Sequence, residues 1–484
     1  MLVCDDCGVT APAADALVAL RGLSRGAGHG LYLGEGEGGA AFAAPQQGAL
    51  VLGPPRSGKT SAVVVPNVLA ACGPVVAAST KPDLLTLTAP ARGAVGDCLL
   101  FDPTGTADLP AGVRRVGWSP LSGASSFDQA SLVAEAMVRA SRPEADRGEG
   151  RHWSERAEAL LSVCFHAGAL GGLSFAEVVT AVDRRELDEL RAVLARGGAE
   201  RPLDVLRSIT ATEDREQSGI WSTASSVLGC YRSQAALESA TGELVDVAGF
   251  VRGGDTLYVC AGSDRQRLVA PVVAGLVRDL RTAAYDLAGT LSPLGTPGGR
   301  PPLLLALDEL ANIAPLHDLP ALVAEGASQG VVTLACLQDL SQAASRWGTH
   351  VADGFLSLFG VKLVFPGLGD TRTLESISRL LGEIDVPTSS VTRTPPLQAL
   401  LTGRFSISRT TGVRRERRLP VEAVARGRPG MALVLEGVEP SFVRTVPWFA
   451  SRELTAALEG RRSPHLISRD RLPARGIDRG PAGR

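Results

Sequence analysis

The sequence predicts an α/β protein in which helices flank a central, mostly parallel sheet and an all-α domain is inserted into the chain. Two observations predict this fold class. Short apolar strands alternate with helical segments before residue 125 and after residue 238. Between those two positions the apolar residues recur at three- and four-residue spacing, as on helices with one buried face. One sheet therefore draws its strands from both sides of a helical block.

The expected strands are short apolar runs. In chain order they span residues 49–53, 74–79, 98–102, 256–262, 302–309, 331–338, 361–367 and 431–437. Residues 21–48 are rich in Gly and polar residues, which predicts short strands and turns. The end of the chain combines little apolar content with much Arg, Pro and Gly, so we expect a disordered tail over 451–484.

The composition is that of an ordinary globular protein, with 45% hydrophobic and 21% charged residues among 484. The formal net charge of -2 excludes a polybasic binder, although a local basic lining remains possible. Most of the eight cysteines lie inside apolar runs, which favours buried thiols in a reducing compartment. Cys4 and Cys7 form a CxxC pair without the second pair that a structural zinc site normally needs.

No secretory signal or membrane-spanning segment is predicted. The longest uncharged run, residues 61–80, contains Pro66 and a Gly73-Pro74 break, so it is interpreted as helix, turn and strand. We therefore expect a cytoplasmic protein. Any attachment to the inner face of the cell membrane would then run through a partner.

A phosphate-binding loop follows the first expected strand. The stretch GPPRSGKT matches GxxxxGK[ST], the Walker A pattern, and lies between an apolar strand and a helix, the context that gives the pattern meaning. Its backbone N–H groups would cradle phosphates, Lys59 would reach the β- and γ-phosphates of a nucleotide, and Thr60 would bind Mg²⁺. The predicted nucleotide-binding residues are Gly53, Pro54, Pro55, Arg56, Ser57, Gly58, Lys59, Thr60 and Ser61.

Two adjacent carboxylates end the apolar strand PPLLLAL. In a parallel sheet the carboxyl ends of the strands face the ligand crevice, so Asp308 is expected to complete the Mg²⁺ shell and Glu309 to activate the attacking water. The next strand ends in Gln338, which is expected to sense the γ-phosphate or position water; a helix-capping or turn role is its alternative. We therefore predict Lys59, Glu309 and Gln338 as catalytic residues.

The Asp-Glu pair favours hydrolysis over phosphoryl transfer to a small acceptor. A small-molecule kinase would also be shorter and would carry a lid, whereas this chain carries a helical insertion. The sequence thus predicts a motor ATPase whose insertion engages something large. The expected divisions are an N-terminal segment (1–44), the nucleotide-binding domain in two parts (45–124 and 239–450), the all-α inserted domain (125–238) and the tail.

Several blocks in this order resemble the type IV coupling proteins, the TraG/TraD group of conjugative DNA-transfer ATPases. The most specific is LALDELANIAPLHDLPALVAEGASQGVVTLACLQDLSQAASRWG, residues 305–348. The other similar blocks are GLYLG (30–34), GPPRSGKT (53–60), STKPDLLTLT (79–88), GWSPLSG (117–123) and FGVKLVFPGLGDTRTLESISRLLG (359–382). The resemblance spans roughly residues 30–450.

The resemblance implies a RecA-like P-loop NTPase fold with an inserted all-α domain. It implies ATP and Mg²⁺ as cofactors and a hexameric ring with ATP bound between subunits. The implied cargo is single-stranded DNA or a relaxase–DNA complex, delivered to a conjugative type IV secretion channel. Implied partners are relaxosome proteins and a channel or membrane-anchor protein. Another RecA-like DNA translocase, for segregation or packaging, is the alternative, and a nucleotide-binding adaptor without turnover is a third.

Two departures from the family pattern stand out. We expect none of the N-terminal transmembrane helices usual in the family, which leaves a soluble subset, docking on a separate membrane protein or a truncated copy as the alternatives. Some members carry an arginine that acts on the neighbouring subunit's nucleotide, and Ala327 lies near its place here. If this protein uses such an arginine, it comes from another position. The candidates are Arg265, Arg267 and Arg372, with a surface or salt-bridge role as the alternative for each.

DNA contacts would come from basic residues, because phosphates carry the charge and no sequence code. The densest basic run, TTGVRRERRLP at 410–420, is one candidate, with an exposed hairpin or loop face as the alternative. Trp153, Trp221 and Trp347 could stack on bases, with a role in the core as their alternative.

Overall fold

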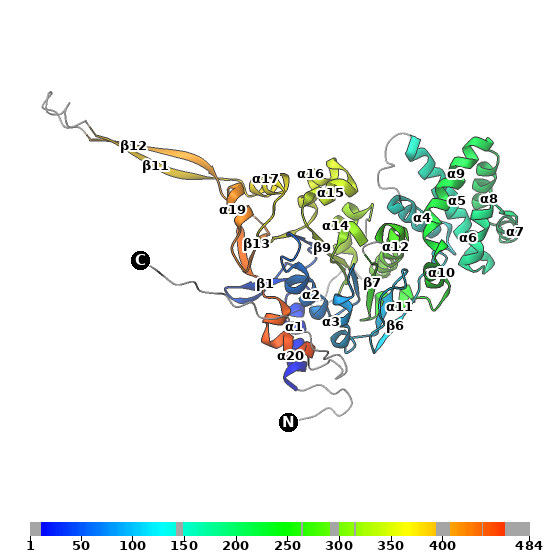
Figure 1. Cartoon of the computed structure of the whole chain (residues 1–484), viewed down its shortest axis with the longest axis horizontal. Helices are drawn as coiled ribbons and strands as arrows, with labels where there is room; N and C mark the ends of the chain where they lie inside the picture. The colour runs from blue at the N-terminus through cyan, green and yellow to red at the C-terminus, as the bar shows by residue number, and fades with distance from the viewer. Residues whose placement is uncertain are drawn as a thin grey trace, which may run out of the picture.

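The computed structural model describes residues 11–141, 149–262, 265–290, 300–313, 316–393, 407–437 and 439–459. The predicted tail beyond residue 459, Cys4 and Cys7 lie outside the described residues. A large α/β body is built on one sheet, with a block of helices at one end and a long two-stranded arm at the other (Figure 1).

A twelve-stranded sheet forms the centre of the body. In spatial order its strands are β2 (Gly39–Phe42), β1 (Tyr32–Gly36), β14 (Pro440–Arg444), β13 (Met431–Leu435), β10 (Val361–Val364), β3 (Ala49–Leu52), β9 (Val331–Leu337), β8 (Leu303–Leu307), β4 (Val75–Ser79), β7 (Thr256–Cys260), β5 (Cys98–Phe101) and β6 (Val113–Arg115). Neighbouring strands from β10 to β6 are parallel. Pairings from β10 outward to β2 are antiparallel.

The eight apolar runs expected as strands all form strands of this sheet, shorter by one to three residues at their ends. Apart from the half-buried Lys362 and Met431, the residues of these eight strands are buried because helices cover both faces, and alternate side chains enter different cores. Along β3, for example, Leu50 and Leu52 belong to one core, and Ala49 and Val51 belong to the other.

One face of the sheet is covered by helices from the second half of the chain. These are α12 (Gln266–Thr290), α13 (Leu310–Ile313), α14 (Leu319–Gly326), the 3-10 turn η3 (Ala327–Gln329), α15 (Leu340–Trp347), α16 (Thr349–Leu358) and α17 (Thr371–Leu380). The opposite face is covered by α1 (Ala11–Gly26), the π-helical turn η1 (Thr60–Val64), α2 (Val65–Ala70), α3 (Asp83–Arg92), the 3-10 turn η4 (Trp448–Ala450) and α20 (Arg452–Glu459).

The named elements described between β6 and β7 are all helices or 3-10 turns. They are α4 (Phe127–Ser141), α5 (Glu149–Gly171), α6 (Phe175–Arg184), α7 (Asp188–Arg196), α8 (Glu200–Thr210), α9 (Asp214–Val227), the 3-10 turn η2 (Leu228–Arg232), α10 (Gln234–Thr241) and α11 (Val247–Arg252). Ser174 starts α6 with a capping box to Glu177, as its residue type favours. α4 packs against α12 and so joins the block to the body.

Two expectations from the sequence are wrong in part. Residues 21–26 complete α1 instead of forming a strand or turn, and Leu17 of that helix is buried. Residues 452–459, expected to be disordered, form α20, which packs on α1 through the buried Leu458. An amphipathic pattern of one or two turns is too short to stand out in a sequence rich in Arg and Gly, and tertiary packing decides the outcome.

The arm is a hairpin of β11 (Glu383–Arg393) and β12 (Ile407–Arg417), followed by α19 (Val421–Arg426). The basic run 410–420 thus begins in an exposed hairpin, one of the two alternatives left open by its composition. Within the described ranges, no helix is both long and apolar enough to cross a membrane.

Candidate functional site

The glycine-rich loop connects β3 to η1 at the carboxyl end of the sheet. Gly58 has a φ of 98°, a conformation that L side chains rarely adopt. A Cβ on Gly53 would lie 2.7 Å from the Ser57 hydroxyl oxygen and 2.8 Å from the Phe365 Cβ. Both positions therefore require glycine, and the loop closes tightly over the end of β3.

Lys59 points back into the loop that precedes it. Its Nζ donates to the carbonyl oxygens of Gly53 at 2.5 Å and Pro54 at 3.0 Å. Burial lowers the pKa of Lys59, and nearby Cys336, Asp308 and Glu309 oppose this shift. The ammonium group is thus held inside the loop by carbonyl dipoles, where an anion could compete for it.

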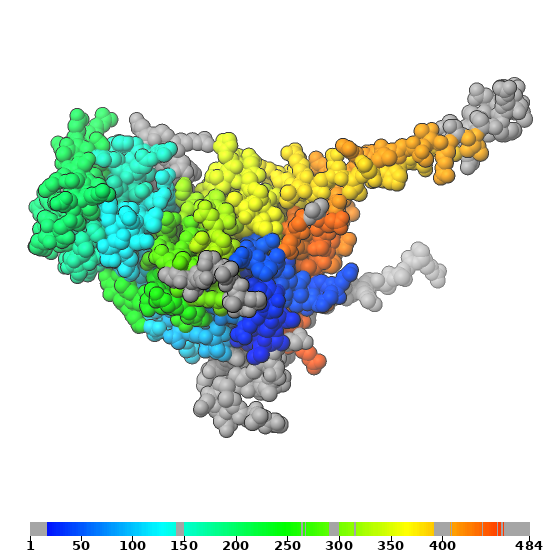
Figure 2. All heavy atoms as spheres, turned by 180° about the vertical axis from the view of Figure 1, so that it is seen from behind, coloured from blue at the N-terminus to red at the C-terminus, as the bar shows by residue number. Residues whose placement is uncertain are grey.

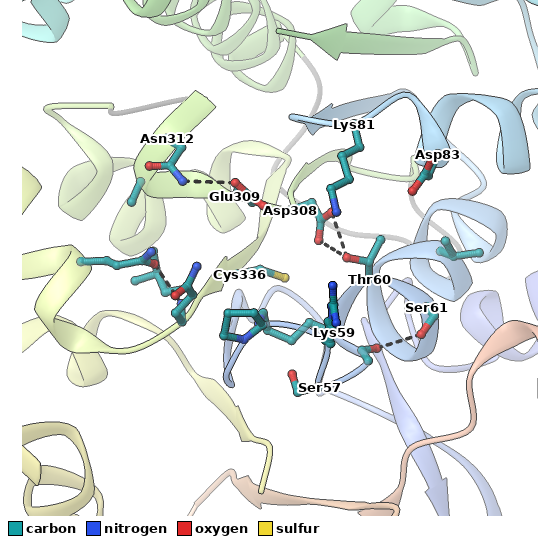
Figure 3. Close-up of a pocket in the computed structure, with 18 of the residues that line it drawn as sticks. Ser57, Lys59, Thr60, Ser61, Lys81, Asp83, Asp308, Glu309, Asn312 and Cys336 are labelled. Atoms are coloured by element: carbon teal, nitrogen blue, oxygen red, sulfur yellow. Dashed lines mark hydrogen bonds between the residues drawn. The ribbon is translucent and has the colours of Figure 1, made fainter. Parts of the chain in front are cut away.

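Asp308 follows β8 and meets the hydroxyl of Thr60. The Thr60 Oγ1 donates to the carboxylate and lies 2.8 Å from Oδ1 and 2.9 Å from Oδ2 (Figure 3). Ser79, the last residue of β4, adds a longer contact of 3.4 Å to Oδ2. Burial raises the pKa of Asp308, and the hydrogen bond from Thr60 opposes that shift. The side-chain oxygens of Thr60 and Asp308, from distant parts of the chain, therefore lie next to each other at this edge of the sheet.

The sheet order explains this convergence. β9 lies between β3 and β8, so the loop and the acidic pair flank one strand, and the end of β4 lies beside β8. The parallel direction brings all these carboxyl ends to the same edge of the sheet. Gln338 immediately follows β9 and therefore also lies at this edge.

Glu309 is turned toward its own helical turn. The Asn312 side-chain amide donates to Glu309 Oε2 at 3.1 Å, and Figure 3 shows the two side chains pointing at one another, away from Lys59. Gln338 has an exposed side chain, and its backbone N–H donates to the Gln342 side chain at 2.9 Å.

A pocket of about 460 Å³ brings these groups together. Nearly all the residues predicted from the motif and strand ends line it: Pro55, Arg56, Ser57, Gly58, Lys59, Thr60, Ser61, Asp308, Glu309 and Gln338. Gly53 and Pro54 shape the loop instead and contribute the carbonyls that hold Lys59.

Sequence reasoning missed other residues of the same pocket. Lys81 and Asp83 follow β4, Asn312 and Gln342 lie one helical turn beyond Glu309 and Gln338, and Trp448 comes from the far end of the chain. Figure 3 shows Lys81 reaching toward Asp308 and Thr60. The STKPD segment after an expected strand was a usable signal for Lys81. No local pattern marks Trp448.

The pocket is lined by both polar and apolar groups. Lys59, Thr60 and the two carboxylates supply charged and hydrogen-bonding groups, whereas Val65, Leu87 and Trp448 supply apolar surface. Leu87 and Trp448 are only partly buried where they pack on the core beneath the loop. Such a lining can accept a ligand that combines anionic groups with a flat apolar group.

The arginine candidates lie in other surroundings. Arg372 forms an exposed ion pair with Asp353, and Arg265 donates to the carbonyl of Thr104 at 3.4 Å. The side chain of Arg267 lies outside the described part of the structure, and Ala327 begins η3. Neither described arginine lines the pocket of this single chain.

The three tryptophans proposed for base stacking pack against other residues. Trp221 is buried, and Trp153 lies against Gly219 beside the helical core. Trp347 stacks near Phe355, and its indole N–H donates to the carbonyl of Leu316 at 2.6 Å. These contacts account for all three rings as packing residues.

Comparison with solved structures shows the fold. The bacterial conjugative coupling protein TrwBdeltaN70, in an unbound monoclinic crystal form, matches with a TM-score of 0.65 at 19% identity, covering 88% of this chain and 90% of the solved chain. TrwB in complex with ADP and Mg²⁺ matches with a TM-score of 0.62 at 19% identity, and the match covers 83% of this chain and 86% of the solved chain. The α/β body described above is therefore a RecA-like fold.

Comparison of sequences shows the family. The chain is similar to a conjugal transfer protein TraG from Escherichia coli, at 25% identity over 389 residues that cover 74% of this chain and 58% of TraG. A second TraG from the same organism is 24% identical over the same coverage. The chain thus spans less than two thirds of the length of these curated relatives. The family model for type IV secretory system conjugative DNA transfer matches residues 15–460, and the chain belongs to this family.

Proposed function

We propose that the chain is an ATP-driven motor that couples DNA to a type IV secretion channel during conjugative transfer. The observation that carries this proposal is the Thr60–Asp308 contact beside Lys59, at the edge of a RecA-like sheet. Family membership supports DNA as the cargo and a type IV secretory system as the channel. The solved complexes of TrwB with ADP and Mg²⁺, an ATP analogue and a GTP analogue support a nucleotide as the ligand.

Lys59 would bind the phosphates. Its ammonium now donates to two loop carbonyls, and phosphate oxygens are stronger acceptors because they are charged. The exchange would move the side chain toward the β- and γ-phosphates while the backbone N–H groups of the loop bind the same anion.

Thr60 and Asp308 fit Mg²⁺, since both offer oxygen ligands and already lie within 3 Å of each other. When bound, Mg²⁺ would neutralise charge on the phosphoryl oxygens. Ser79 would keep Asp308 oriented. The proposed metal residues are thus Thr60 and Asp308.

Glu309 would activate the attacking water, and Gln338 would position it. Both follow strands that flank the phosphate site. The Asn312 amide holds the Glu309 carboxylate to one side, so we propose that turnover requires this hydrogen bond to open.

The working assembly we propose is a ring of six copies acting on single-stranded DNA or a relaxase–DNA complex. An arginine from a neighbouring copy would then complete the site, with Arg265, Arg267 and Arg372 as the candidates. Relaxosome proteins and a channel or anchor protein are the proposed partners.

The test measures ATP hydrolysis by purified protein with and without single-stranded DNA, and particle mass with Mg²⁺–nucleotide. We expect DNA-stimulated hydrolysis and ring-sized particles. Glu309→Gln should bind ATP but lower turnover by at least about a hundredfold, whereas the exposed control Glu325→Gln should match the unaltered protein. Absence of hydrolysis under both conditions contradicts the motor proposal. Unchanged turnover in Glu309→Gln contradicts the role given to Glu309.

A further inference from the structure

The hairpin arm leaves the body without packing against it. β11 and β12 form eleven cross-strand pairs, from Glu383 with Arg417 to Arg393 with Ile407. Every side chain described on the two strands is exposed except the half-buried Val386. Figures 1 and 2 show the arm projecting from the side of the body opposite the helical block. At about 3.4 Å per residue, it reaches about 37 Å.

The base of the arm is fixed. The backbone N–H of Arg418 donates to the carbonyl of Gly382 at 3.0 Å, and the Ser378 hydroxyl donates to the carbonyl of Leu419 at 2.7 Å. The first bond closes the hairpin at its base, and the second joins the residue pair after β12 to α17. A two-stranded ribbon with no third strand or core is only marginally stable in water, so a surface that binds it would stabilise it.

The arm differs from the rest of the chain in charge. The sequence from Val386 to Arg415 contains no Asp or Glu, although the whole chain has a net charge of -2. The same stretch contains five arginines: Arg393, Arg404, Arg409, Arg414 and Arg415. Carboxylates occur only near the base, at Glu383, Asp385 and Glu416. The outer arm is therefore complementary to an anionic partner.

The ion pairs near the base leave the guanidinium groups of Arg414 and Arg415 accessible to another anion. Arg414 lies 3.5 Å from Glu416 and Arg415 lies 3.5 Å from Asp385, and both guanidinium groups are more than 70% exposed. Exposed pairs of this kind contribute about 1 kcal/mol or less, so a phosphate could compete for them.

Both faces of the ribbon carry hydroxyl and guanidinium groups. Cross-strand partners share a face, so the register assigns Ser390, Thr410 and Arg414 to one face and Thr411, Arg409 and Arg415 to the other. Hydroxyl and guanidinium groups are among the groups that contact DNA phosphates and sugars. The described strands contain no aromatic residue, whereas proteins that hold single strands usually stack bases on aromatic rings.

We propose that the β11–β12 arm binds the backbone of duplex DNA next to the strand that the motor moves. The proposal rests on the proposed function for the presence of DNA. A two-stranded ribbon can enter the major groove of a duplex, and the reach of the arm is close to one helical turn of about 34 Å. Contacts from Arg409, Arg414 and Arg415 would go to phosphates, so binding has no sequence preference and weakens with salt.

The test compares binding to a fluorescent duplex of about three helical turns with binding to one of its single strands, by anisotropy. The variant is the triple substitution Arg409→Ser, Arg414→Ser and Arg415→Ser. The control removes three exposed arginines of the helical block, Arg184→Ser, Arg196→Ser and Arg201→Ser. For the arm variant we expect duplex affinity to fall more than tenfold and the slope of log affinity against log salt to fall by about 2.7, or 0.9 for each lost contact.

The control variant should lose less than about threefold in duplex affinity, in keeping with the weak effect of distant surface charges. Single-strand-stimulated hydrolysis should persist in the arm variant, because the arm lies outside the nucleotide pocket. Equal losses in both variants, or an unchanged salt slope in the arm variant, overturn the proposal. Loss of ring assembly with unchanged duplex binding also overturns the proposal, because the arm would then form a contact between subunits. If the unaltered protein binds duplex through the arm but hydrolyses no ATP, the motor proposal fails and the arm proposal stands.

Discussion

Two charged groups of the pocket are held where water solvates them poorly. Burial raises the pKa of Asp308 and lowers the pKa of Lys59, so in both residues it disfavours the charged form. Both charges are nevertheless needed for the Mg²⁺ and phosphate binding that we propose. The free protein therefore carries an electrostatic cost at this site, and a bound nucleotide with its metal would relieve it.

Asp308→Asn should raise the melting temperature of the free protein by about 2 °C while abolishing Mg²⁺-dependent nucleotide binding. The neutral amide avoids the cost of the buried charge and can still accept the Thr60 hydrogen bond. Because the folded-state pKa of Asp308 is raised, the penalty in the unaltered protein exists above that pKa and disappears as pH falls through it. Thermal unfolding measured across pH should therefore show the gain at neutral pH and its loss in acid.

A gain in stability that persists unchanged into acid would show that the buried charge of Asp308 is not its source. The exposed Asp204, changed to Asn, is the matched control and should leave the melting temperature unchanged at every pH.

Asn312→Ala should raise hydrolysis in the absence of DNA by up to about tenfold, since a hydrogen bond to a charged group contributes about 1.5 kcal/mol. The amide of Asn312 restrains Glu309, so its removal should free the carboxylate before DNA binds and reduce the stimulation by DNA. Steady-state rates with and without single-stranded DNA measure both effects. A fall in both rates would instead mean that Asn312 aligns Glu309 for catalysis.

At the scale of elements, one buried arginine joins three parts of the sheet edge opposite the pocket. Arg92, the last residue of α3, is fully buried. It donates to Thr256 Oγ1 at 2.7 Å, to the carbonyls of Gly73 and Gly254 at 2.9 and 2.8 Å, and to the carbonyl of Ala71. These bonds hold α3 against the amino ends of β4 and β7.

Arg92→Lys should lower stability by about 3 kcal/mol, because an ammonium cannot bond four acceptors spread around a planar guanidinium and leaves carbonyls unpaired in the core. Thermal unfolding should show a melting temperature lower by several degrees. The exposed Arg201→Lys serves as the control. Equal melting temperatures for the two variants would contradict the bracing role of Arg92.

Strands buried on both faces were predictable because their apolar runs are continuous and short. The arm was not, because its strands bury nothing and so carry no apolar alternation, and Pro387 and Gly412 argue against strand by propensity. Within the site, the glycine loop and the Asp308-Glu309 pair were found because each is a local pattern. Gln342 and Trp448 reach the pocket only through the tertiary arrangement of the chain, which a local pattern does not contain.

At the scale of the whole molecule, the pocket is assembled across almost the entire chain. The loop after β3, near the amino end of the described chain, and Trp448, just before the last described helix, both line it. The helical block lies between the two parts of the chain that line the pocket. Its two ends are neighbours in space, since Gly117 pairs with Leu244. Trp118 fixes the junction through its indole N–H, which donates to Asp279 of α12 at 2.9 Å.

Trp448→Ala should weaken binding of ATP and GTP alike, since stacking of a base on an aromatic ring contributes about 1–3 kcal/mol and depends little on the base. Binding of inorganic tripolyphosphate, which lacks a base, should not change. Phe449→Ala is the matched control, because Phe449 is 62% exposed and does not line the pocket. Calorimetric titration measures all three ligands, and an equal loss for tripolyphosphate would contradict stacking.

The packing of α20 on α1 has a practical consequence for handling the molecule. These two helices lie side by side although they belong to opposite ends of the described chain, and the arm extends away from them (Figure 1). A linker attached at either helix would tether the protein to a glass surface by the same face. Immobilised in this way, every molecule would present its arm to the solution, which gives optical-tweezer measurements a defined direction of pull.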